Sequence, residues 1–61
     1  MRAAISITMN NAAFDDEPEI ELARILRDLA ARVERGYDQV NLRDANGNKV
    51  GEFKIVNKRK N

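Results

Sequence analysis

The sequence predicts an α+β fold in the order βαββ, with one amphipathic helix packed on one face of a three-stranded, largely antiparallel sheet. Three observations lead to this prediction. Apolar residues alternate near the start of the chain, they recur at helical spacing between residues 20 and 33, and two alternating segments flank the turn signal Asn46-Gly47. Residues 1–57 are predicted to form a single domain, and residues 58–61 form a basic tail.

Residues 3–9 have the period of a half-buried strand. Ile5, Ile7 and Met9 point to one side of this strand, and the small residues between them point to the other side. Asn10-Asn11 ends the segment. We therefore expect Ile5 and Ile7 to pack beneath the helix.

The helix has signals at both ends. Asp16 and Glu19 have the spacing of a capping box, and Pro18 falls in the first turn, where its missing N–H costs nothing. Gly36 stands where a helix often ends in a left-handed residue. Ile20 falls on the opposite side from the apolar face, which gathers Leu22, Ile25, Leu26, Leu29, Ala30 and Val33.

The segment after the helix predicts a β-hairpin. Asn46-Gly47 is the preferred pair for a type I′ turn, because both central positions of that turn need a positive φ. A two-residue loop at 46–47, or a four-residue loop at 45–48, pairs Leu42 with Gly51 and Val40 with Phe53. A three-residue loop would send Phe53 outward unless a bulge restored the alternation. We therefore expect one of the even loops.

The composition removes most catalytic and metal chemistry. The chain has no Cys and no His, so disulfides, thiol nucleophiles and the commonest metal ligand are absent from it. Asp44, Asn46 and Asn48 are spaced like the opening of a calcium loop, but Lys49 stands in place of the required Gly and Ile55 in place of the bidentate Glu. We therefore expect no enzyme and no catalytic, cofactor-binding or metal-binding residue. The acidic residues 15–19 are explained by helix capping and the helix dipole.

The small size of the chain predicts a partner subunit. A domain of this length buries only about 60% of its unfolded surface, and neither a disulfide nor a metal site is available to stabilise it. One helix leaves the far face of the sheet uncovered, where alternation places Val50 and Val56, and the sheet also has two edges. We expect a two-fold homodimer formed through that face or an edge strand.

The charge pattern favours a protein partner over nucleic acid. The net charge is only +1, and Glu21, Asp28 and Glu34 are interleaved with the arginines of the helix. Nucleic-acid or signalling-nucleotide binding through these arginines and the basic tail remains the alternative function. The residues that we expect to contact a partner are Arg24, Arg27, Arg32, Arg35, Arg43, Val50 and Val56.

No segment has the length and apolar character of a transmembrane helix or a secretory signal, so we expect a cytoplasmic protein without a membrane partner.

Three segments resemble a family of short phage and prophage proteins of unassigned function: N-N-A-A-F at 10–14, E-L-A-R-I-L-R-D-L-A at 21–30 and L-R-D-A-N-G-N-K-V-G-E-F at 42–53. In size and in lack of catalytic chemistry, the chain is similar to inhibitors of bacterial defence systems such as anti-CRISPR proteins, which commonly occlude a surface of a larger host complex. The resemblance implies a phage-derived, non-enzymatic binding protein that occludes a target such as a bacterial defence complex in the host cytoplasm.

Overall fold

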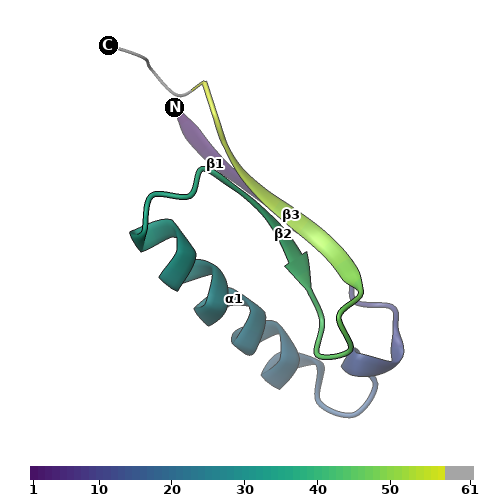
Figure 1. Ribbon diagram of the computed structural model, residues 1–61. Helices are drawn as coiled ribbons and strands as arrows, with labels where there is room; N and C mark the ends of the chain where they lie inside the picture. The colour runs from purple at the N-terminus through teal and green to yellow at the C-terminus, as the bar shows by residue number, and fades with distance from the viewer. Residues whose placement is uncertain (58–61) are drawn as a thin grey trace.

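The computed structural model describes residues 1–57 and has the predicted α+β architecture, with one helix packed against a three-stranded antiparallel sheet (Figure 1). The predicted basic tail, residues 58–61, lies outside the described residues. The sheet has the order β1-β3-β2, so the last strand lies between the first two. The elements are β1 (Arg2–Ile7), the short 3-10 helix η1 (Ala12–Phe14), α1 (Pro18–Glu34), β2 (Gln39–Arg43) and β3 (Lys49–Val56).

The two ends of α1 differ in how well the sequence predicted them. The N-cap is Glu17, without a side-chain capping bond, so the predicted capping box of Asp16 is wrong. The reason is Pro18, whose ring disfavours the helical conformation in the preceding residue and so prevents an earlier start. The predicted end is confirmed. Gly36 has φ +98°, and the N–H groups of Gly36 and Tyr37 donate to the carbonyls of Val33 and Arg32 at 2.9 and 3.2 Å.

The hairpin has a three-residue loop, so the prediction of an even loop is wrong. The Gly47 N–H donates to the Asp44 carbonyl at 3.0 Å, and the Asp44 N–H donates to the Asn48 carbonyl at 2.9 Å. Gly47 has φ +86°, whereas Asn46 does not have the positive φ that a type I′ turn requires. The Asp44 carboxylate provides the reason, because it accepts from the N–H groups of Asn46 and Asn48 and holds the loop in this conformation.

A bulge in β3 restores the register after this loop. Arg43 pairs with Lys49, but Leu42 pairs with Gly51, so Val50 is an extra residue without a partner on β2. The predicted pairs Leu42–Gly51 and Val40–Phe53 are therefore confirmed. The bulge turns Val50 into the core, where its exposure is 7%, so its predicted place on the far face of the sheet is wrong.

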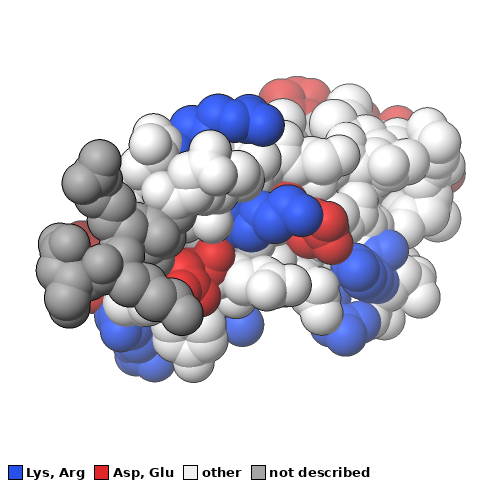
Figure 2. All heavy atoms as spheres, turned by 90° about the horizontal axis from the view of Figure 1, so that it is seen from above, with Lys and Arg blue, Asp and Glu red and all other residues white. Residues whose placement is uncertain are grey.

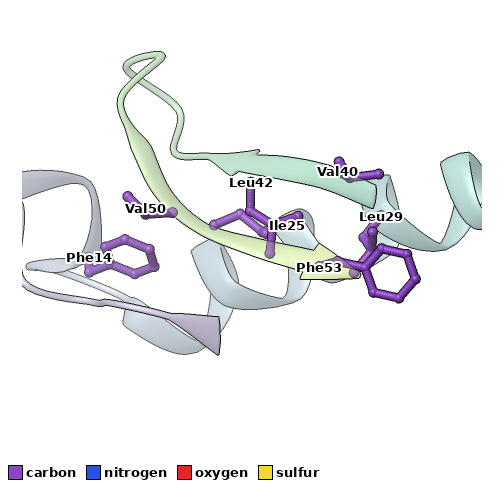
Figure 3. Close-up of a cluster of buried hydrophobic side chains, with 7 residues drawn as sticks. All are labelled: Phe14, Ile25, Leu29, Val40, Leu42, Val50 and Phe53. Atoms are coloured by element: carbon purple, nitrogen blue, oxygen red, sulfur yellow. The ribbon is translucent and has the colours of Figure 1, made fainter. Parts of the chain in front are cut away.

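The core lies between α1 and the β2–β3 side of the sheet. Ile5 shares the helix-facing side of the sheet with Phe53, its cross-strand partner, yet Ile5 is 50% exposed because α1 lies against β2 and does not cover β1. The expectation that Ile5 packs beneath the helix is therefore wrong, whereas Ile7 does pack against the core. The buried side chains, drawn in Figure 3, are Phe14, Ile25, Leu29, Val40, Leu42, Val50 and Phe53.

Among residues 1–57, no helix combines the length and the apolar character that a membrane span requires.

Candidate functional site

Two carboxylates are buried next to each other in the fold, Glu21 on α1 and Asp44 directly after β2. Both lie at the junction where the start of α1 meets the hairpin loop, because Glu21 accepts a hydrogen bond from Ala45. The sequence placed Glu21 among the acidic residues interleaved with the helix arginines, and Asp44 in an incomplete calcium-loop pattern. Burial gives them a different role, because a carboxylate removed from water has to be surrounded by hydrogen-bond donors.

Asp44 organises the hairpin loop from the inside. One carboxylate oxygen, Oδ1, accepts from the backbone N–H groups of Asn46 and Asn48, both at 2.9 Å. The other, Oδ2, accepts from Asn11 Nδ2 at 2.6 Å and from Asn48 Nδ2 at 3.4 Å. Burial by itself would raise the pKa of Asp44, but the hydrogen bonds from Asn48, Asn46 and Asn11 outweigh it and lower the pKa below its ordinary value. The Asp44–Lys49 loop is thus a turn held by its own side chain.

Glu21 joins the helix to this loop. Its two oxygens accept from Arg24 Nε and Nη2, both at 3.0 Å, and Oε2 also accepts from the Ala45 N–H at 2.7 Å. The hydrogen bonds from Arg24 are the main cause of a lowered pKa for Glu21, against the opposing effect of burial. Arg24 then continues the network, because its Nη2 donates to the Arg43 carbonyl at 3.2 Å.

These lowered pKa values predict a loss of stability in acid. A carboxyl group whose pKa is lower in the folded chain stabilises the fold above its ordinary pKa, and this contribution is lost as the pH falls through the folded value. We expect the urea midpoint of unfolding to be lower at pH 3 than at pH 7.

Asp44→Asn should lower the midpoint at pH 7, because the amide NH2 group would face the N–H donors of the loop. It should also reduce the pH dependence of the midpoint, because an amide does not titrate. Asp16→Asn, at an exposed position, is the control. An Asp44→Asn protein with the wild-type pH profile would contradict this account.

A cleft of about 180 Å³ lies between α1 and β2, beside this network. It brings together three of the predicted partner-binding residues, Arg24 and Arg32 from α1 and Arg43 from the end of β2. We call it the arginine cleft. Its apolar lining comes from Ile25, Leu29, Val40 and Leu42, and its polar lining also includes Asp28, Asn41 and Asp44.

At the arginine cleft, the two charges of the Glu21–Arg24 pair differ in burial. The Glu21 side chain is 10% exposed, whereas that of Arg24 is 43% exposed, so the negative charge lies inside and the guanidinium lies outside. Arg32 pairs with Asp28 at 3.5 Å on the open surface, where such pairs contribute little. Arg43 is held in place by a bond from its Nη1 to the Gly47 carbonyl at 3.1 Å. Since a guanidinium has five N–H donors, these contacts leave donors for an outside acceptor.

The other predicted partner-binding residues do not line the arginine cleft. Arg27 is exposed elsewhere on α1, and Arg35 is the C-cap of the helix. Val50 is in the core, so it is not available to a partner, and half-buried Val56 pairs with Arg2 at the end of the sheet. The sequence could not group Arg43 with Arg24 and Arg32, because that grouping depends on where the helix lies across the sheet.

The cleft fits recognition of an anion better than proton transfer or metal binding. A general base needs a pKa near the working pH and a free lone pair, whereas both buried carboxylates have lowered pKa values and oxygens occupied by N–H donors. Within the part of the chain that the structure describes, no group of three acidic side chains is placed to hold a metal ion.

The chain matches no family model, no curated protein and no solved structure.

Proposed function

We propose that this chain is a non-enzymatic binding protein that occludes an acidic surface of a larger protein target, and that the arginine cleft makes the central contact. The observation behind this proposal is that Arg24 and Arg43 are held in fixed positions at the cleft, with the Glu21 carboxylate buried and the Arg24 guanidinium more exposed. Arg24 and Arg43 are fixed by hydrogen bonds while parts of their guanidinium groups face outward. Side chains that are already ordered lose little further entropy on binding, and Arg forms bidentate bonds with carboxylates.

The size and lining of the cleft favour a protein partner. A volume of about 180 Å³ admits one acidic side chain, and a carboxylate there would accept hydrogen bonds from the arginine N–H groups. Binding sites on proteins concentrate their affinity in such buried contacts, in which Arg is enriched. In Figure 2, acidic and basic side chains are interspersed on the face shown, and no continuous basic surface for a phosphate backbone is seen there.

The target class follows from the resemblance to small phage inhibitors. A small protein that covers an acidic surface of such a complex would act by steric exclusion. We place this activity in the cytoplasm of the host bacterium. Catalysis has no part in it, since the buried carboxylates serve as hydrogen-bond acceptors that fix the loop and Arg24.

Capture from a bacterial host lysate tests this function with matched variants. We expect the immobilised wild-type chain to retain a protein partner in stoichiometric amount. Arg32→Gln and Arg43→Gln should each weaken retention by about tenfold or more, in line with about 1.5–3 kcal/mol for a hydrogen bond to a charged group. Arg35→Gln, which removes the same charge outside the cleft, should retain the partner. Failure to retain any stoichiometric protein, or equal retention by all four proteins, would contradict the proposal.

Binding of nucleic acid or a signalling nucleotide is the second candidate, because a phosphate could accept from the same outward N–H donors. It predicts an affinity that falls steeply as salt rises, and a general loss of affinity when residues 58–61 are deleted. Anisotropy titrations with a labelled oligonucleotide at two salt concentrations separate the two candidates. Tight, strongly salt-dependent binding would favour the nucleic acid, whereas the proposed function predicts only weak binding.

A further inference from the structure

An apolar groove runs along the opposite flank of α1 from the arginine cleft. It is present because α1 lies against β2 and leaves the helix-facing side of β1 open. Ile5, Leu26 and Val33 line this groove and are 50%, 40% and 39% exposed, with Phe53 at its floor. Ala30 lies between the two exposed helix residues, so a second apolar surface can approach α1 closely here. We call this surface the β1 groove.

The strand that borders the β1 groove is an edge strand. The order β1-β3-β2 leaves the outer side of β1 without a neighbouring strand among the described residues. After Arg2, its first residue, β1 has no charged residue and no proline, so most of its length lacks the features that normally prevent pairing at an edge. The other edge strand, β2, is shorter and is bracketed by Asp38 and Arg43. An unprotected edge and an open apolar groove therefore occur on the same strand.

The charges at the two ends of the β1 groove are opposite. Because β1 and β2 are both antiparallel to β3, α1 must run back antiparallel to β1 on its way from one to the other. The start of α1 therefore lies at the end of the sheet where β1 finishes, and the end of α1 lies at the opposite end, where β1 begins with Arg2. The approach to α1 and its first turn carry Asp15, Asp16, Glu17 and Glu19, whereas the last turn and C-cap carry Arg32 and Arg35 around Glu34.

We propose that a second copy of this chain covers the β1 groove, with the two β1 strands paired antiparallel across a two-fold axis perpendicular to the sheet. This arrangement forms a continuous six-stranded sheet with both helices on the same face. It places the acidic end of each protomer toward the basic end of the other, as antiparallel alignment requires. Ile5 of each copy then lies beside Ile5 of the other, and the exposed Leu26 and Val33 face the joint groove from both sides.

The proposed dimer is independent of the proposed function. The arginine cleft lies between α1 and β2, at the outer edge of the joined sheet, so both copies of the cleft remain open in the dimer. Of the two surfaces that the sequence offered for a two-fold dimer, the far face of the sheet or an edge strand, the proposal takes the edge strand β1 and its groove. A second copy is favoured over an unrelated segment because each copy supplies an identical unprotected strand and complementary charged ends.

Sedimentation equilibrium of the full chain tests the dimer with a matched pair of variants. We expect the wild-type chain to approach twice the 6.9 kDa monomer mass at high micromolar concentration. Ile5→Lys should raise the dissociation constant at least tenfold, because it places a charge on the pairing edge. Ile20→Lys is the control, since Ile20 is 55% exposed on the side of α1 away from the core. Circular dichroism monitors the folding of each variant.

Val33→Lys provides a second test if Ile5→Lys does not fold, because it changes the β1 groove from the α1 side. It should also raise the dissociation constant, because the lysine would lie at the joint groove. A wild-type mass of one protomer at high micromolar concentration would overturn the proposal. So would a dimer that Ile20→Lys weakens as much as the folded groove variants do.

Discussion

Replacing Val50 with lysine is expected to unfold the domain at 25 °C. The side chain is 7% exposed and belongs to the core cluster with Phe14 and Phe53. An ammonium group placed there without a partner would cost several kcal/mol. A domain of this length has a free energy of unfolding of about 3–9 kcal/mol, taking about 0.05–0.15 kcal/mol per residue. The loss is therefore comparable with the total, and circular dichroism should show it directly.

The matched change is Val56→Lys, at a half-buried position near the end of β3. A lysine there can extend its ammonium into water, so we expect a loss of no more than about 1 kcal/mol. This comparison separates the bulged register from simple alternation, under which both valines would lie on the far face of the sheet. A Val50→Lys protein with wild-type stability would contradict the bulge.

Gly51→Ala is expected to disrupt the pairing of β1 with β3. A Cβ atom at this position would lie 1.9 Å from the Ser6 carbonyl oxygen and 2.9 Å from the Ile7 Cα, both in the backbone of β1. Backbone atoms cannot move aside as the end of a side chain can, so β1 would have to shift away from β3. Overpacking in a core costs about 1–3 kcal/mol and occasionally more, and we expect a loss at or above the upper end of that range.

Gly47→Ala is the control for this change, because it adds the same methyl group in open space. Nothing lies within 4 Å of a Cβ atom at Gly47, and its cost comes only from φ +86°. That cost is about 1–2 kcal/mol for a non-glycine residue in the left-handed region. Chemical denaturation of both proteins measures the difference. A larger loss for Gly47→Ala than for Gly51→Ala would contradict the close approach of β1 to Gly51.

The sequence predicted the elements because each depends on local periodicity. The pairs Leu42–Gly51 and Val40–Phe53 followed from alternation, and the left-handed Gly36 followed from the helix pattern. Alternation does not show where an extra residue enters a strand, so the bulge at Val50 was missed. Two errors compensated each other here. The loop has three residues where the sequence predicted two or four, and the bulge at Val50 returns β3 to the predicted register.

The candidate site was less accessible to prediction, because its contacts join residues far apart in the chain. Glu21 reaches Ala45 across 24 positions, and Asn11 reaches Asp44 across 33. A capping pattern and a turn pattern each explain their own residues, and neither shows that the two segments meet. The same holds for the exposure of Ile5, since alternation identifies the inner face of β1 but not the position of α1 across the sheet.

The most direct measurement of the central claim is a nuclear magnetic resonance titration of the labelled chain with a short polyglutamate peptide. We expect the Nε–H signals of Arg24, Arg32 and Arg43 and the amide signals of β2 to shift together and saturate. The Arg35 signal should not move, and Arg32→Gln should weaken the titration about tenfold, as expected for about 1.4 kcal/mol. Shifts spread evenly over all the arginines, or none at the cleft at saturating peptide, would contradict the claim that this cleft recognises an acidic partner.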